Sequence, residues 1–423
     1  MRITYLMINA DIVCGGNRTV FGQVNGLIER GHDVKLLALA GDKPFIPLKT
    51  AVINVPRFDG MIPPSDIVVA TFNIRALPRY NPNDEIPFYM TLINESYYWD
   101  DPIHREICNL LYRSPMNLLV NSTWTMEIFR KELHRQSYRI PDGIDLDFFK
   151  SRKDKILCAK NRKVLIMYRG GINKGLSYGL EALGLIKKRS SDIEIVLFGT
   201  DELPKVDFPY TFFFNPPQED LVRIYSSCDA FIIPSLLEGS PNPPKEAMAC
   251  GCAVVSTDWP GHQDICVDQE TALVVPRRDP KRLAEAAIKI LEDDLLRSRL
   301  IEGGYKKVKE FEWRRVIGEL EEVFERVKEL KSQRDLREMT EWEKVVAISP
   351  EDAWAHYQFG IELSKMGRMK EVEREFEEAA RCDPSFELPL ESLRILRGGQ
   401  RVFPQDWSDL KGSLLIAKGE DCL

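Results

Sequence analysis

The 423-residue sequence lacks several features that would place it in a membrane or on nucleic acid. No run of about 18 apolar residues occurs, and the amino-terminal stretch has no apolar core ending in small residues, so we expect neither a membrane span nor a secretion signal. Basic residues are not in excess, because 58 Lys and Arg stand against 65 Asp and Glu, a net charge of −7. Non-specific nucleic-acid binding needs clustered positive charge, so nucleic acid is not an expected partner. These absences predict a cytoplasmic protein.

Three common ligand-binding patterns are missing too. No GxGxxG occurs, which argues against a nicotinamide cofactor, and the lysine of RGGINKG precedes its last glycine, so this stretch is not a GxxxxGK[ST] phosphate loop. The nine cysteines are scattered without a CxxC or Cys/His cluster, which indicates reduced thiols. We interpret Asp145 and Asp147 as the start of a helical turn and not as metal ligands. No cofactor and no metal is therefore expected.

The sequence does contain a long series of short apolar runs. They alternate with helical patterns, which is typical of parallel sheets covered on both faces, and they continue after a basic stretch in the middle of the chain. We therefore expect an α/β protein with two doubly wound, Rossmann-like domains. The basic stretch is expected to be a solvated linker, with contact to anionic lipid as the alternative. The predicted division is 1–150 for the first domain, 151–163 for the linker, 164–315 for the second domain, 316–335 for a connecting helix, 336–398 for helical repeats and 399–423 for a tail.

The carboxy-terminal part changes character. Residues 353–386 place small, large and terminating residues at the positions of a 34-residue tetratricopeptide repeat, and 340–350 resembles the second half of a preceding repeat. So few repeats do not bury a core by themselves. We expect this segment either to pack on the neighbouring domain or to dock a protein partner.

The stretch EGSPNPPKEAMACG, which begins at residue 238, places two glutamates around a cluster of Gly, Pro and Asn. The prolines forbid a continuous helix, so Glu238 is expected in a loop and the helix is expected to start near Pro243 with Asn242 as its cap. Glu246 then lies near the helix start, where backbone N–H groups suit an anion or sugar hydroxyls. Two carboxylates there would accept paired hydrogen bonds from vicinal hydroxyls of a ribose or hexose. The alternative is that Glu246 merely complements the helix dipole.

Two glycine-containing turns follow other predicted strands. In RGGINKG, glycines between Arg169 and Lys174 let a ligand approach the backbone, so the two cations would hold a diphosphate; otherwise they are solvated surface residues. In CGGNR, the glycines precede a helix that Asn17 would cap, and they are either a ligand turn or simply a tight turn. Between the domains, Asp142 and Gly143 predict a turn with positive φ at the glycine.

Taken together, these stretches resemble the family-4 retaining glycosyltransferases. EGSPNPPKEAMACGCAVV is similar to the E-x7-E signature of that family, and RGGINKG has the Arg-to-Lys spacing of its diphosphate-binding loop. The early GG with NGLIERGHDVKLL, the turn IPDGIDLDFF and the late PGHQDICVDQETALVVP also match the family's order. The resemblance spans about residues 1–315 and does not cover the repeat-like segment. It implies the GT-B arrangement, with two Rossmann-like domains facing each other across a cleft.

The resemblance also implies roles for particular residues. Arg169 and Lys174 would neutralise the donor diphosphate, where negative charge grows as the sugar–phosphate bond breaks. Glu246 would hold the ribose and Glu238 the transferred sugar, while Gly16 would offer its backbone to the phosphates from the opposite wall. The remaining donor-binding positions implied are Gly199, Gly239, Ser240, Pro241 and Asn242.

This sequence departs from the family at one position near the transferred sugar. The family usually carries a His after the fourth strand of the first domain, whereas here Asn94 or Glu95 takes that place. His104 is a further candidate on the acceptor side. The stretch FFFNPP also lacks the family's glycine near the base pocket.

The resemblance implies a metal-independent, retaining transfer of a sugar from a nucleotide-sugar donor to a glycan, lipid-linked or small-molecule acceptor. Such reactions serve cell-envelope polysaccharide biosynthesis, and a lipid-linked acceptor would bring the protein to the inner face of the membrane as a peripheral contact. Two alternatives remain: a catalytically degenerate GT-B scaffold whose residues 336–398 dock a protein, and a nucleotide-sugar epimerase or phosphorylase on the same fold.

Overall fold

The computed structural model describes residues 1–71, 85–93, 95–98, 102–157, 160–202, 206–332 and 339–397. The first domain is built on a seven-stranded parallel sheet of order β3-β2-β1-β4-β5-β6-β7. Its strands are β1 (Arg2–Asn9), β2 (Asp33–Ala40), β3 (Val52–Asn54), β4 (Ile67–Thr71), β5 (Ile86–Thr91), β6 (Asn117–Val120) and β7 (Tyr138–Arg139). Its helices are α1 (Gly15–Glu29), the short η2 (Glu95–Tyr98), α2 (Pro102–Tyr112) and α3 (Thr123–Leu133).

The second domain repeats this design with a six-stranded parallel sheet of order β10-β9-β8-β11-β12-β13. Its strands are β8 (Lys163–Tyr168), β9 (Glu194–Gly199), β10 (Thr211–Phe214), β11 (Ala230–Ile233), β12 (Ala253–Thr257) and β13 (Ala272–Val275). Its helices are η3 (Ile172–Lys174), α4 (Leu176–Arg189), α5 (Gln218–Ser227), α6 (Asn242–Ala249), η4 (His262–Asp264), α7 (Pro280–Glu292), α8 (Asp294–Val308) and η5 (Lys309–Phe311). Strands β11 and β12 are buried along their whole length, as expected for a sheet covered on both faces.

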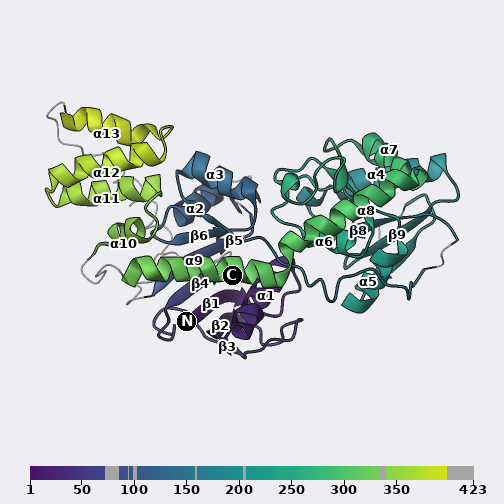
Figure 1. Ribbon diagram of the computed structural model, residues 1–423, viewed down its shortest axis with the longest axis horizontal. Coiled ribbons are helices and arrows are strands. Elements are labelled where there is room, and N and C mark those ends of the chain that lie inside the picture. Colours follow the sequence, from purple (N-terminus) through teal and green to yellow (C-terminus); the bar gives the residue numbers. More distant parts are fainter. Residues whose placement is uncertain are drawn as a thin grey trace.

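Helix α9 (Trp313–Ser332) ties the two domains together. It follows the second domain in sequence but runs back along the first, as Figure 1 shows. Its apolar face, which includes Val316, Leu320 and Phe324, joins the core formed by β1, β2 and α1. The carboxy-terminal end of the second domain is thereby fixed to the first.

Gly143, in the turn between the domains, does not have the positive φ that the sequence predicts. A Cβ atom at this position would stand 2.3 Å from the indole ring of Trp313. The glycine is therefore required by the close approach of α9 and not by an unusual backbone angle.

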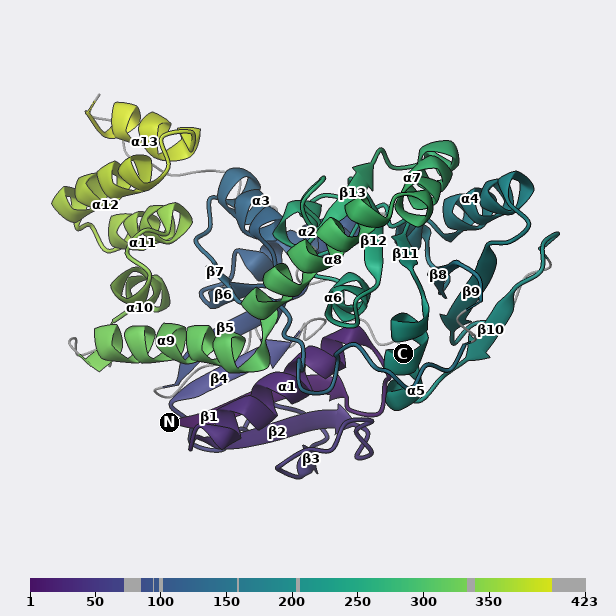
Figure 2. The same cartoon turned by 45° about the vertical axis from the view of Figure 1, so that its right-hand side comes forward.

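The carboxy-terminal helical segment consists of α10 (Glu341–Ile348), α11 (Ala353–Lys365), α12 (Met369–Cys382) and α13 (Glu387–Arg397). It lies at the end of the first domain that faces away from the second in both Figure 1 and Figure 2. The contact is built around Arg135, which is fully buried and donates to Asp352 at 2.8 Å and to three backbone carbonyls of the first domain. Of the two expectations for this segment, packing on the neighbouring domain is the one the structure shows.

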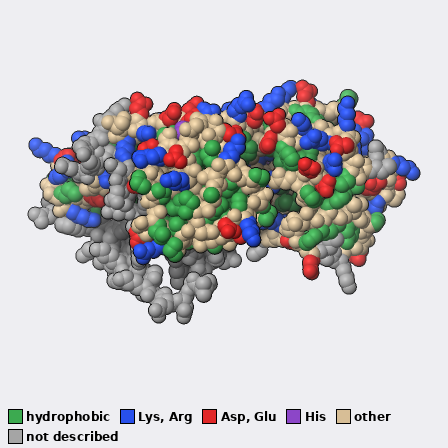
Figure 3. Space-filling model, turned by 90° about the horizontal axis from the view of Figure 1, so that it is seen from below, with side chains coloured by type: hydrophobic (Ala, Val, Ile, Leu, Met, Phe, Trp, Pro, Cys, Tyr) green, Lys and Arg blue, Asp and Glu red, His purple; other side chains and the backbone are tan. Residues whose placement is uncertain are grey.

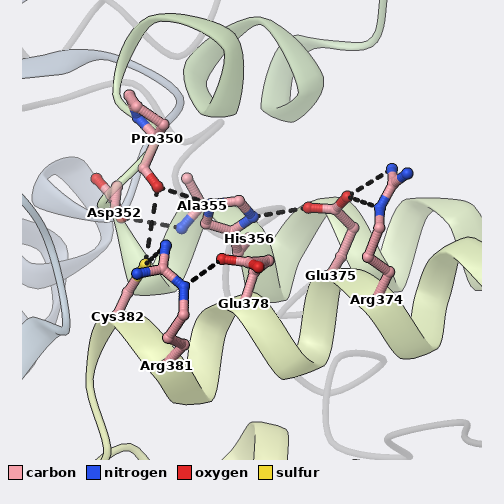
Figure 4. Close-up of polar contacts among 9 residues, drawn as sticks. All are labelled: Pro350, Asp352, Ala355, His356, Arg374, Glu375, Glu378, Arg381 and Cys382. Atoms are coloured by element: carbon pink, nitrogen blue, oxygen red, sulfur yellow. Dashed lines mark hydrogen bonds and ion pairs between the residues drawn. The ribbon is translucent and has the colours of Figure 1, made fainter.

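Within this helical segment, α11 and α12 are joined by a buried ion pair. Figure 4 shows His356 of α11 and Glu375 of α12 pointing toward each other, at 2.7 Å between Nδ1 and Oε2, while Nε2 lies 3.0 Å from the carbonyl of Pro350. Both ring nitrogens thus face acceptors, which favours the doubly protonated imidazolium. Burial lowers the pKa of His356, but these acceptors raise it more, and the net shift is upward.

The surface carries charge of both signs. On the face drawn in Figure 3, Lys and Arg are interspersed with Asp and Glu, in keeping with the small negative net charge. In the part of the chain that the structure describes, no helix is both long and apolar enough to cross a membrane.

Candidate functional site

A cavity of about 740 Å³ lies between the two Rossmann-like domains. It brings together residues that are far apart in sequence: Gly16 from the first domain, and Arg169, Lys174, Glu238 and Glu246 from the second. The loop after Glu238 lines it as well, with Gly239, Ser240, Pro241 and Asn242. All of the predicted donor-binding residues except Gly199 therefore share one site.

Glu238 lies in the loop that follows β11 and is held from two directions. Lys174 Nζ donates to both of its carboxylate oxygens, at 2.8 and 3.0 Å, and Ser235 Oγ donates to Oε1 at 2.8 Å. Glu238 is buried while the Lys174 side chain is about one-third exposed, and both residues line the cavity. The pair fixes the carboxylate in position beside a cation that a phosphate would also attract.

Glu246, on α6, is buried, and each of its two oxygens accepts one hydrogen bond. Arg18 of the first domain donates to Oε1 at 2.9 Å, across the cavity, and the Tyr225 hydroxyl donates to Oε2 at 3.1 Å. Burial, helped by the neighbouring Glu246 carboxylate, raises the pKa of Tyr225 well above its usual range, so its hydroxyl stays a donor. The carboxylate therefore does more than complement the dipole of α6, because it connects the two domains.

Two helices of different domains begin at this cavity. Helix α1 starts at Gly15 and α6 at Asn242, and a Cβ atom on Gly15 would lie 4.0 Å from the Asn242 amide. Helix amino termini carry unpaired N–H groups and a partial positive charge. Together with Arg169 and Lys174 they make this part of the cavity suited to an anion.

The helix caps differ from those expected. At α6 the cap position is Pro241, without a side-chain hydrogen bond, and Asn242 is the first helical residue. At α1 the cap is Cys14, whose sulfur accepts from the N–H of Asn17, while the Asn17 amide donates to the carbonyls of Asn9 and Ile12. Both predicted caps are wrong, because α6 begins at Asn242 itself and α1 begins at Gly15, two residues before Asn17, so the preceding Pro241 and Cys14 take the cap positions.

A buried lysine, Lys245, lies next to Glu246 in sequence. Its ammonium group donates to the carbonyl of Asp142 at 2.6 Å and to the carbonyl and hydroxyl of Ser240 at 3.3 and 3.2 Å. Burial lowers the pKa of Lys245 to about 8. Burial raises the pKa of Asp142, against the opposing effect of Lys245. Lys245 thus links α6 to the turn between the domains, and no local sequence pattern singles it out.

Of the remaining predicted residues, neither Gly199 nor Glu95 lines the cavity. Gly199 ends β9 but does not line the cavity, whereas its neighbours Phe198 and Thr200 do; a Cβ on Gly199 would collide with the Tyr168 carbonyl. Glu95 starts η2 and contacts Tyr89 and Tyr112 through hydrogen bonds, and is not among the lining residues. Asn94 and the side chain of His104 lie outside the described residues.

Asp145 and Asp147 occupy the turn before Phe149. Asp145 Oδ1 accepts from the N–H groups of Asp147 and Phe148, at 2.9 Å each, as expected for a helical turn. No cluster of three or more His, Cys, Asp or Glu side chains suited to a metal ion occurs among the residues described.

Comparison with known proteins relates both the fold and the second domain to glycosyltransferases. A family model described as "Glycosyl transferases group 1" matches residues 147–307. A phosphatidyl-myo-inositol mannosyltransferase of Mycobacterium tuberculosis is 26% identical over 241 residues, covering 53% of this chain and 61% of that protein. The enzyme of the same name from Mycolicibacterium smegmatis is 30% identical, covering 48% of this chain and 54% of that protein. The alignments thus span little more than half of these relatives, which are glycosyltransferases.

Solved structures identify the architecture. A sucrose-phosphate synthase from Thermosynechococcus elongatus superposes with a TM-score of 0.65 at 18% identity, covering 79% of this chain and all of that one. Anabaena HepE in complex with UDP-glucose superposes with a TM-score of 0.61 at 15% identity, covering 77% of this chain and 99% of that one. Two parallel Rossmann-like sheets that face a common cavity are the GT-B fold, and this chain has it.

Proposed function

We propose that the protein is a retaining glycosyltransferase that moves a sugar from a nucleotide-sugar donor to a glycan or lipid-linked acceptor. The observation that carries this proposal is the cavity in which Arg169, Lys174, Glu238 and Glu246 meet Gly16 of the opposite domain. Their arrangement is in keeping with the roles implied by an E-x7-E signature. The group 1 family match over the second domain supports the same reaction class.

The residue types suit the chemistry. Breaking a sugar–phosphate bond builds negative charge on the leaving diphosphate, and fixed cations in a water-poor site stabilise such charge. Arg169, Lys174 and the amino termini of α1 and α6 are those positive groups. We propose that they act without a metal ion and that the sugar keeps its anomeric configuration.

The acceptor class is proposed from the relatives. One is a phosphatidyl-myo-inositol mannosyltransferase, and another, from Campylobacter jejuni, acts on a diphospho-undecaprenol-linked sugar and is 29% identical over 32% of this chain. A lipid-linked acceptor would bring this protein into peripheral contact with a membrane, as in the assembly of cell-envelope polysaccharides.

The first test is a thermal-shift screen of the purified chain against UDP, GDP and ADP and their common sugar conjugates. A ligand that binds only the folded protein raises Tm by mass action. We expect a shift with one nucleotide family and its loss in Glu246→Ala. Arg169→Ala should lower kcat/KM for transfer about a hundredfold, because one charge-stabilising donor is removed. Product anomers analysed by NMR, with and without EDTA, test retention and metal independence.

Arg223→Ala is the matched control, since Arg223 is exposed on α5, pairs with Asp154 and Asp220, and does not line the cavity. It should bind and transfer like the wild type. A folded wild-type chain that binds none of these nucleotides would instead favour the binding-scaffold alternative. Consumption of a nucleotide sugar without any acceptor would favour the epimerase alternative.

We further propose that α11 and α12 are a tetratricopeptide-like helix pair. A Cβ atom on Gly360 would stand 2.5 Å from the ring of Phe376, so the small residue of one helix accommodates the large residue of the other. This is the small-to-large complementarity that the repeat pattern predicts. Gly360→Leu should therefore destabilise the helical segment while leaving nucleotide binding unchanged.

A further inference from the structure

An exposed aromatic side chain stands in the first-domain wall of the cavity. Tyr97, in η2, lines the cavity and is 42% exposed. Among the residues described, the large apolar side chains that are exposed and also line the cavity are those of Tyr97 and Val13. Phe45, by contrast, lines the cavity but packs on Phe21 of the first-domain core. Tyr97 is thus an aromatic residue that the fold leaves accessible at the cavity.

The ring of Tyr97 is held in position by two residues of α3. The ring of Trp124 packs against it, with centroids 5.6 Å apart, and the Tyr97 hydroxyl donates to Glu132 Oε1 at 2.9 Å. Trp124 in turn lies against the second domain, since a Cβ atom on Gly261 would stand 3.0 Å from its own Cβ. A side chain that is already fixed loses little conformational entropy when a ligand packs on it. Tyr97 is therefore a preformed contact surface.

The chemistry of an aromatic ring defines what this surface suits. The face of the ring carries partial negative charge, so it repels an anion such as a diphosphate. A pyranose sugar has C–H bonds on one side of its ring, whose weakly positive hydrogens pack on an aromatic face, while the hydroxyls around the rim stay free for hydrogen bonds. A sugar ring is therefore the part of the proposed substrates that Tyr97 suits.

The position of Tyr97 decides which sugar this is. The chain reaches η2 shortly after Leu92, which also lines the cavity and whose carbonyl lies against Gly239, in the loop that follows Glu238. Because Lys174 and Glu238, the proposed donor ligands, belong to the second domain, the second substrate has to approach from the first-domain wall. We propose that Tyr97 is a stacking platform for the acceptor sugar. The proposal rests on the proposed transfer reaction and narrows the acceptor to a molecule whose reacting end is a pyranose.

The test uses the full chain with the nucleoside diphosphate selected by the thermal-shift screen. The probes are the methyl α-glycosides of glucose, mannose and galactose, whose dissociation constants are measured by saturation-transfer NMR. We expect wild type to bind at least one of them, Tyr97→Phe to bind it within about twofold, and Tyr97→Leu to bind it about tenfold more weakly, because leucine keeps an apolar side chain but removes the aromatic face. Equal affinity of all three chains for the nucleoside diphosphate would show that the variants are folded.

Tyr210→Leu is the matched control, because Tyr210 is 37% exposed and does not line the cavity; it should bind the glycosides like the wild type. Octyl glycosides of the same sugars test an alkyl chain as the occupant. If they bind wild type and Tyr97→Leu equally while the methyl glycosides do not bind, the surface holds a lipid chain and the platform is overturned. Nucleotide binding without methyl-glycoside binding that depends on Tyr97 would likewise overturn the platform alone. A wild-type chain that binds no nucleotide would overturn the proposed function, and with it the assignment of this sugar as the acceptor.

Discussion

At the scale of single residues, the least expected group is the ammonium of Lys245. It is fully buried between α6 and the interdomain turn, and its other close neighbour is the ring of Phe311, at 5.1 Å from the centroid. Taking an ammonium out of water disfavours its charged form, and burial accordingly lowers its pKa from 10.5 to about 8.

This shift predicts a particular pH dependence of stability. Between about pH 8 and pH 10.5 the unfolded chain keeps the Lys245 proton and the folded chain has lost it, so stability rises with pH across this range. A shift of this size corresponds to ~3 kcal/mol. Lys245→Met should remove this rise, which urea unfolding of both proteins from pH 7 to pH 10.5 would measure. Lys306→Met, at an exposed residue, should keep the wild-type profile; parallel profiles for Lys245→Met and wild type would contradict the prediction.

A site residue can be predicted from the sequence when it belongs to a local pattern, and not when its role depends on how the domains meet. Glu238, Glu246, Arg169 and Lys174 stand in local patterns of glycine, proline and charge after strands, so their proximity to one end of the sheet could be predicted. Arg18 could not, because its partner Glu246 lies in the other domain and depends on how the domains meet.

At the scale of elements, the attachment of the carboxy-terminal helices includes a buried ion pair between Arg135 and Asp352, beside contacts such as His134 with Asp383 and Ser349 with Asn117. Arg135 and Asp352 are each 1% exposed, and Asp352 also caps α11 by accepting from the N–H of Ala355. Asp352→Asn keeps an oxygen for the cap but leaves the Arg135 charge uncompensated. We expect a loss of about 3 kcal/mol in the free energy of unfolding, measured by urea denaturation.

The control for this change is Glu371→Gln, which breaks the exposed pair between Glu371 and Arg368. Exposed pairs contribute about 0 to 1 kcal/mol, so its effect should be small. Limited proteolysis should also release the helical segment sooner in Asp352→Asn than in the wild type or in Glu371→Gln. Equal stability of the two variants would show that the attachment does not depend on the Arg135–Asp352 ion pair.

Elements with continuous apolar runs were predictable, and the short edge strands of the first sheet were not. All six strands of the second sheet appear in the sequence as apolar runs. Five of them are mostly buried, and strands buried on both faces need apolar residues throughout. The sixth, β10, is an edge strand whose residues are exposed or half-buried although three of the four are Phe. Strands β3 and β7, with three and two residues at the two edges of the first sheet, carry polar and exposed positions and gave no such signal. Their pairing depends on the neighbouring strand and not on their own sequence.

At the scale of the whole molecule, the two domains meet through backbone as well as side chains. The Thr123 N–H donates to Asp264 at 2.7 Å, and Arg18 reaches Glu246. They also approach closely at Gly239, whose missing side chain lets its loop lie against the Leu92 carbonyl of the first domain. Under the proposed function, donor and acceptor bind from opposite walls of the cavity, so this distance would govern how they meet.

Gly239→Ala therefore tests how the spacing of the domains governs function. Its backbone does not have positive φ, so alanine adds no local strain, but its Cβ would stand 2.0 Å from the Leu92 carbonyl oxygen. Because neither backbone can give way alone, we expect the domains to separate, with a larger radius of gyration by X-ray scattering and kcat/KM for transfer reduced about a hundredfold. Gly318→Ala, in α9 with nothing within 4 Å, should leave both unchanged and stabilise the helix by up to about 1 kcal/mol. Wild-type scattering and activity in Gly239→Ala would mean that the loop can shift without moving the domain, and that the contact at Leu92 does not set the width of the cavity.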